Sequence, residues 1–139
     1  AYKGGNMVAV MDVPHEQTGS YGIVMPGPDD GRIVQVKGLV EKPDPSSAPS
    51  NIAVVGRYIV TPKVFETLAA QERGAGGEIQ LTDALAKQIG KAPFSGVRFS
   101  GERFDCGSKL GFLQANVAFG LNNDVMRGQL RDWLGERLK

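Results

Sequence analysis

Two adjacent residues of opposite charge, Glu41 and Lys42, stand where an apolar segment ends at Pro43. A carboxylate accepts hydrogen bonds from hydroxyl groups and an ammonium group offsets phosphate charge, so the pair could hold a phosphorylated polyol. Because Pro43 stops the strand, both side chains would lie at its carboxyl end, where open α/β sheets bind ligands. The alternative is a solvated charged turn, which the local pattern by itself favours.

A second candidate is Asp105, which follows Phe104 and precedes a turn at Gly107. An aspartate in this setting could bind a hard cation, but one carboxylate is only part of a Mg²⁺ site, because Mg²⁺ keeps waters and substrate phosphates as ligands. The alternative is an aspartate that organises the turn or caps the next helix. We interpret the neighbouring Cys106 as a small buried residue and not as a nucleophile, because no histidine partner is apparent.

Glycines mark two further places where a backbone could approach a ligand closely. Gly22 follows Tyr21 in a short strand pattern, and the alternative there is a tight turn. Gly76 and Gly77 precede Glu78 at the start of an expected helix. The alternative at this position is an acidic first turn that complements the helix dipole.

The elements that must position these residues are strands in the first two-thirds of the chain and helices in the last third. Apolar and alternating patterns predict strands over 7–13, 21–24, 32–36, 51–60, 94–99 and 103–104. The cluster at 26–31 predicts a turn, and Gly38 is expected to break a strand. Helices are expected from Thr61-Pro62, over 78–89, from Ser108 and from Asn123 or Asp124. The apolar face of the helix that begins near Ser108 is expected to be Leu110, Leu113, Val117 and Leu121.

Length and composition indicate a globular α/β protein. The 139 residues fit one ordinary domain, and a formal net charge of +1 excludes a strongly basic nucleic-acid-binding protein. We expect no nucleic-acid partner and, since no apolar run is long enough to span a bilayer, no membrane association. Cys106 is the only cysteine, which fits a reducing compartment, and a cytoplasmic location is expected. The chain begins at Ala1 without an initiator methionine, as if it started within a longer protein.

The order and wording of these motifs closely resemble the bacterial UTP–glucose-1-phosphate uridylyltransferases, also called UDP-glucose pyrophosphorylases. The resemblance runs over nearly the whole chain and rests on the segments 4–6, 10–14, 21–24, 40–43, 48–58, 77–84 and 105–111. It covers only the C-terminal half of the enzyme. The family's glycine-rich nucleotide-binding loop, its uridine-reading residues and one of its two metal-associated aspartates belong to the N-terminal half, and nothing here matches them.

The resemblance implies an α/β fold: the C-terminal half of a Rossmann-like nucleotidyltransferase, a mixed β-sheet with flanking helices and a helical C-terminus. Residues 1–107 would carry the sugar-phosphate site, and residues 108–139 would form helices that make subunit contacts in a homo-oligomer. Trp133 and Leu134 are the expected anchors of those contacts.

The resemblance also assigns roles to individual residues. Glu41 would hold glucose hydroxyls, Lys42 would contact the sugar phosphate, and the backbone of Gly22 would face the sugar. Asp105 would bind Mg²⁺ and, with Lys42, serve catalysis. Three further residues would lie along the sugar pocket, and they are Val55, Gly56 and Tyr58.

The implied reaction is the formation of UDP-glucose and pyrophosphate from UTP and glucose 1-phosphate. We expect this chain to be a fragment that supplies the sugar-phosphate side of the site and is inactive alone. Two alternatives stay open. One is a non-catalytic assembly or interaction module, and the other is a related enzyme that transfers a different nucleotide or uses a different sugar.

Overall fold

The structure is a computed structural model that describes residues 2, 4–70 and 78–139. It divides into two compact units, Ala1–Phe99 and Ser100–Lys139, and each is described by itself. The boundary between the units precedes the functional boundary that the sequence placed after Gly107. The assignment of a function to each part stays a prediction, and Gly76 and Gly77 lie outside the described residues.

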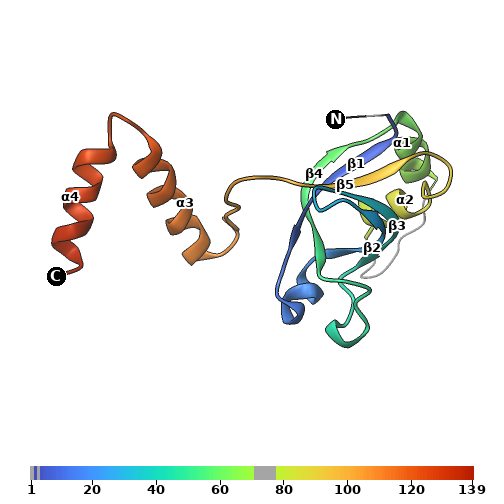
Figure 1. Ribbon diagram of the computed structural model, residues 1–139, viewed down its shortest axis with the longest axis horizontal. Coiled ribbons are helices and arrows are strands. Elements are labelled where there is room, and N and C mark those ends of the chain that lie inside the picture. The colour runs from blue at the N-terminus through green and yellow to red at the C-terminus, as the bar shows by residue number, and fades with distance from the viewer. Residues whose placement is uncertain (1, 3, 71–77) are drawn as a thin grey trace. The chain divides into compact units, whose positions relative to one another are not determined.

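The first unit is built on a mixed sheet of five strands (Figure 1). The strands are β1 (Asn6–Asp12), β2 (Gly22–Asp29), β3 (Ile33–Glu41), β4 (Ile52–Ile59) and β5 (Phe94–Arg98). Their order is β1-β4-β2-β3-β5, and the pairing of β5 with β1 closes the sheet on itself. Only the β1–β5 pair is parallel among these strand pairs, so the mixed α/β fold that the sequence predicted is confirmed.

Alternating valines form the core inside this closed sheet. Val8 and Val10 of β1 and Val34 and Val36 of β3 are buried. Their spacing of two residues places them on one face of each strand, because successive side chains of a strand point to opposite faces. Burying one such side chain stabilises the fold by about 1.5–3 kcal/mol, so this row specifies which face of the sheet is inside.

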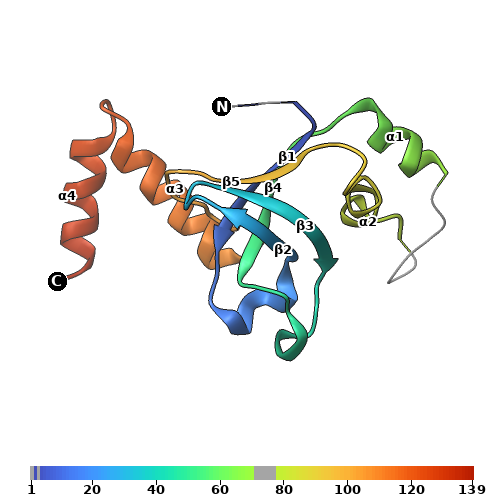
Figure 2. The same cartoon turned by 45° about the vertical axis from the view of Figure 1, so that its right-hand side comes forward.

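Two short helices pack together at one end of the sheet (Figure 2). They are α1 (Pro62–Ala69) and α2 (Leu81–Ala86). Val64 of α1 and Leu85 of α2 are buried in the same core as the valines of the strands. Two 3₁₀ helices, η1 (His15–Ser20) and η2 (Pro45–Ser47), are neighbours in the loops before β2 and after β3.

Several local predictions were wrong. The segment predicted as a turn continues β2 through Asp29, because bulges next to Pro26 remove the need for regular ladder hydrogen bonds there. Gly38 lies within β3 opposite Met25, where an added Cβ would come 3.1 Å from the Met25 Cβ. Helix α2 is shorter than expected, and residues 103–104 form no strand.

The second unit is a pair of helices, α3 (Lys109–Asn122) and α4 (Arg127–Arg137). Ser108 begins α3 as predicted, since its hydroxyl accepts a hydrogen bond from the Gly111 N–H at 3.0 Å. The helices approach closely at Gly120, where an added Cβ would lie 2.5 Å from the Leu130 Cδ2. No helix in the described part of the chain is long and apolar enough to cross a membrane.

Two predictions about the second unit were wrong. The buried residues of α3 are small ones, Gly111, Ala115 and Gly120, whereas Leu110 and Leu113 are exposed. The small residues are buried because they allow close backbone packing, which the sequence pattern of large apolar residues does not reveal. Cys106 is also exposed, because it lies in the turn before α3.

Candidate substrate-binding site

Three of the predicted site residues meet at the end of β3. Glu41, the last residue of β3, is paired with Gly22, the first residue of β2. The next residue, Lys42, donates its backbone N–H to the Tyr21 carbonyl at 3.0 Å. The antiparallel β2–β3 pair therefore places the carboxylate, the lysine and the glycine together, where β2 begins and β3 ends.

Lys42 has an unusual backbone conformation. Its φ of +44° is the only positive value at a non-glycine residue among residues 2, 4–70 and 78–139. The left-handed region costs an L-residue roughly 1–2 kcal/mol, so the surrounding structure must hold it there. The hydrogen bond to Tyr21 and the burial of Pro43 supply that support. Strain of this kind is concentrated at functional sites, and the Lys42 side chain itself is exposed.

The carboxylate of Glu41 is half-buried and held by a residue from another element. Thr82, in the first turn of α2, donates its hydroxyl to the Glu41 Oε2 at 2.7 Å. A Cβ added at Gly22 would lie 3.1 Å from the same Oε2 and 3.4 Å from the Thr82 Oγ1. Glu41, Thr82 and Gly22 therefore form one compact cluster.

Thr82 was not among the residues that the sequence singled out. It lies in the segment 77–84, which carries part of the resemblance, but the resemblance gave no reason to select one side chain from that segment. The contact joins residues that are 41 positions apart. A local pattern holds no signal for such a pair, because it forms only when α2 packs against β3.

Val55, Gly56 and Tyr58 lie in an irregular part of β4. The register between β1 and β4 shifts here, and Gly56 has a φ of +83°, which favours glycine. Burial, together with the negative charge of Glu41, raises the pKa of the Tyr58 phenol above its ordinary value. The negative charge of Glu41 thus acts on the Tyr58 phenol.

Asp105 belongs to the second unit and organises a turn. Its Oδ1 accepts a hydrogen bond from the Gly107 N–H at 3.1 Å, and its carbonyl accepts one from the Ser108 hydroxyl at 3.0 Å. This geometry is that of the turn-forming alternative, and it leaves an exposed carboxylate. No cluster of three or more potential metal-binding side chains occurs within the described ranges, so a metal role for Asp105 stays a prediction.

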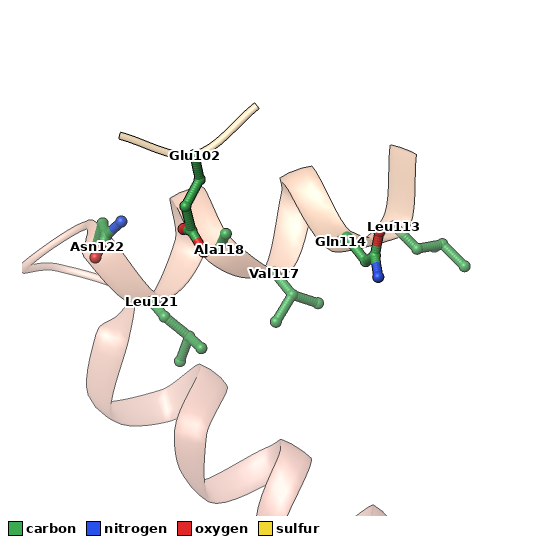
Figure 3. Close-up of a pocket in the computed structure, with 7 residues that line it drawn as sticks. All are labelled: Glu102, Leu113, Gln114, Val117, Ala118, Leu121 and Asn122. Carbon is green, nitrogen blue, oxygen red and sulfur yellow. The ribbon is translucent and has the colours of Figure 1, made fainter. Parts of the chain in front are cut away.

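A depression of about 520 Å³ lies on α3 in the second unit. Figure 3 shows Val117 and Leu121 pointing to the same side of the helix, and Glu102 pointing toward Ala118. Leu113, Val117 and Leu121 form the apolar part of its lining. With Glu102 as its only ionisable residue, this depression has no constellation for catalysis and is better suited to contacts with another apolar surface.

Comparison with known proteins identifies the fold and its relatives. Residues 1–120 match the family model described as nucleotidyl transferase. The chain belongs to the nucleotidyl transferase family. A UTP–glucose-1-phosphate uridylyltransferase of Komagataeibacter xylinus is 56% identical over 131 residues, which cover 94% of this chain and 44% of the relative. The enzyme of the same name from Bacillus subtilis is 45% identical over 125 residues, covering 90% of this chain and 43% of the relative.

Solved structures agree with these relatives. A UDP-glucose pyrophosphorylase in complex with UDP-glucose superposes with a TM-score of 0.79 at 38% identity, over 86% of this chain and 45% of that one. A UTP-bound enzyme of Acinetobacter baumannii gives a TM-score of 0.80 at 36% identity, over 95% of this chain and 45% of that one. The chain thus spans less than half the length of these nucleotidyl transferase relatives, and the resemblance seen in the sequence is confirmed.

Proposed function

We propose that this chain supplies the sugar-phosphate side of a uridylyltransferase site that forms UDP-glucose and pyrophosphate from UTP and glucose 1-phosphate. The observation that carries the proposal is the Glu41 and Lys42 pair at the end of β3, beside Gly22. The names of the relatives and the UDP-glucose in one solved structure support this choice of substrates.

The two charged residues divide the work of binding. Glu41 accepts hydrogen bonds from glucose hydroxyls, while Lys42 neutralises the sugar phosphate. In the reaction an oxygen of that phosphate attacks the α-phosphorus of UTP in line, and pyrophosphate leaves. Catalysis of this type depends on positioning and charge neutralisation, so the role of Lys42 is to hold the nucleophile where it can attack.

The pocket continues onto β4 in this proposal. Val55, Gly56 and Tyr58 line the sugar in this proposal, and the effect of the Glu41 charge on the pKa of Tyr58 supports the placement of Tyr58. The open backbone at Gly56, where an added Cβ would meet nothing within 4 Å, leaves room for a ligand.

Mg²⁺ is the proposed metal and Asp105 its one ligand from this chain. The exposed Asp105 carboxylate fits a site in which waters and substrate phosphates provide the other ligands. When bound, the ion would offset negative charge on the reacting phosphates.

We also propose that the chain forms a homo-oligomer through its C-terminal helices. Large apolar side chains on both helices are exposed, among them Leu110, Leu113, Phe119 and Trp133. An apolar surface of this extent is a feature of protein–protein contacts. The cytoplasm is the proposed location, on the ground of the single cysteine.

Calorimetric titration of the chain with UDP-glucose and Mg²⁺ tests the sugar-phosphate site. We expect binding by the wild-type chain and its loss in Glu41→Ala and in Lys42→Ala. Lys37→Ala is the matched control, because Lys37 is an exposed lysine on the same strand. The proposal would be contradicted if Glu41→Ala and Lys42→Ala both bound UDP-glucose with the affinity of the wild-type chain.

A further inference from the structure

Thr82 makes a long-range hydrogen bond to the residue that is proposed to bind the sugar. Its hydroxyl donates to the Glu41 Oε2 at 2.7 Å, which is an ordinary distance for a hydroxyl bonded to a carboxylate. Across residues 2, 4–70 and 78–139, no second hydrogen bond to the Glu41 carboxylate is found. The Glu41 Oε1 thus accepts no hydrogen bond from these residues.

The position of Thr82 is set by the packing of α2. Thr82 is 9% exposed, and two residues that follow it, Ala84 and Leu85, are buried in the core. Near the end of the helix, the buried Gln88 donates its amide to the Thr67 hydroxyl of α1 at 2.6 Å. Because threonine is stiff at χ1, a backbone held in this way also fixes the direction of its hydroxyl.

Gly22 provides the space in which this hydrogen bond forms. An added Cβ would approach both the Glu41 Oε2 and the Thr82 side chain to within 3.1–3.5 Å. The missing side chain thus lets Thr82 and Glu41 meet above the backbone of β2.

We infer that Thr82 is a positioning residue that holds one oxygen of Glu41 so that the other oxygen is aimed at the sugar hydroxyls. The inference rests on the proposed function of Glu41. A free glutamate side chain loses rotamer freedom when it binds a ligand, and a side chain already held loses less. A carboxylate oxygen can accept more than one hydrogen bond, so the Thr82 contact leaves Glu41 able to bind a polyol.

Three variants and a double-mutant cycle test the inference, with UDP-glucose and Mg²⁺ as the probe in calorimetry of the full chain. Thr82→Val keeps the shape and removes the hydroxyl, and we expect a dissociation constant about tenfold higher. Thr82→Ser restores the hydroxyl and should restore affinity. In a Glu41→Gln background, Thr82→Val should change the affinity much less, because Thr82 acts through Glu41.

Thr18→Val is the matched control, since Thr18 is also a buried threonine and its hydroxyl also makes a hydrogen bond of 2.7 Å, to the His15 carbonyl. We expect it to change stability without changing affinity. If Thr82→Val has the wild-type dissociation constant while Glu41→Gln loses affinity, the inference about Thr82 is overturned and the proposed function of Glu41 stands. Equal affinity in Glu41→Gln and wild type, or no binding by a folded wild-type chain, would overturn the proposed function and the inference with it. A Thr82→Ser variant as weak as Thr82→Val would show that packing and not the hydroxyl matters, which also overturns the inference.

Discussion

The pKa of the Tyr58 phenol depends in part on the charge of Glu41. Burial is the main reason why the pKa of its phenol lies above the ordinary value, and the negative charge of Glu41 is the second. Both disfavour the phenolate, because one removes water from it and the other repels it. The tyrosine is therefore a probe of the candidate site in the absence of any ligand.

Replacing Glu41 by glutamine should lower the pKa of Tyr58, since the repulsion of the phenolate disappears while the burial remains. The measurement is an NMR titration of the chain labelled at its tyrosines, with the Tyr58 signal assigned by Tyr58→Phe. Glu66→Gln, on the exposed side of α1, is the control and should leave the pKa unchanged. An unchanged pKa in Glu41→Gln would contradict the closeness of the two residues.

The same shift predicts how stability changes at alkaline pH. A raised pKa in the folded state means that the unfolded chain releases the Tyr58 proton first as the pH rises. The contribution of Tyr58 to the free energy of unfolding is therefore fully present below the pKa of about 10 that the phenol has in the unfolded chain. It is lost as the pH rises through the higher pKa of the folded state.

At the scale of the elements, Arg98 forms ion pairs with residues at the ends of two other strands. Its Nε lies 2.8 Å from the Asp12 Oδ2 at the end of β1, and its Nη1 lies 2.9 Å from the Asp29 Oδ2 at the end of β2. One guanidinium from β5 thus bridges two other strands. The planar group can do so because its donors point in several fixed directions, which a lysine ammonium does not provide.

Arg98→Met should lower the free energy of unfolding by about 1 kcal/mol, because the ion pairs are partly exposed and two carboxylates would lose their shared cation. Arg98→Lys should recover only part of the loss. Urea unfolding of the full chain measures both, with Arg57→Met on β4 as the control. Since salt screens exposed charges, the difference should shrink at high ionic strength, and a salt-independent difference would argue against an electrostatic origin.

At the scale of the whole molecule, large apolar residues of α3 and α4 are exposed. Trp133, one of the two expected anchors, is exposed and has the Arg137 guanidinium 4.9 Å from its ring centre. Leu134 is only partly exposed. Aromatic residues and arginine are enriched at the centres of protein interfaces, so this end of α4 fits the proposed homo-oligomer.

Sedimentation velocity over a range of concentrations should show self-association of the chain, and Trp133→Ala or Leu113→Glu should shift it toward monomer. Both changes remove apolar surface that is exposed in the single chain, and burial of that surface would favour association. Gln129→Ala, which removes a polar side chain from α4, should have no such effect. A wild-type chain that stays monomeric throughout would contradict the proposed oligomer.

The sequence by itself determined the features that depend on neighbouring residues. The end of a strand shortly before Pro43, the helix that begins after Thr61 and the cap at Ser108 are all in the structure. Each follows from local chemistry: proline has no N–H and a fixed φ, and a serine at a helix start satisfies a free N–H. The pair Glu41 and Lys42 could be selected for the same reason, because their side chains are adjacent in the chain.

Only the tertiary structure decided which distant residues meet. The bond from Thr82 to Glu41, the bridge from Arg98 to Asp12 and Asp29, and the closure of β5 onto β1 all join segments far apart in the chain. The exposure of Leu110 and Leu113 was decided there as well, because small residues form the buried side of α3. Such contacts depend on how the elements pack, and a pattern of residue types along the chain has no direct relation to that packing.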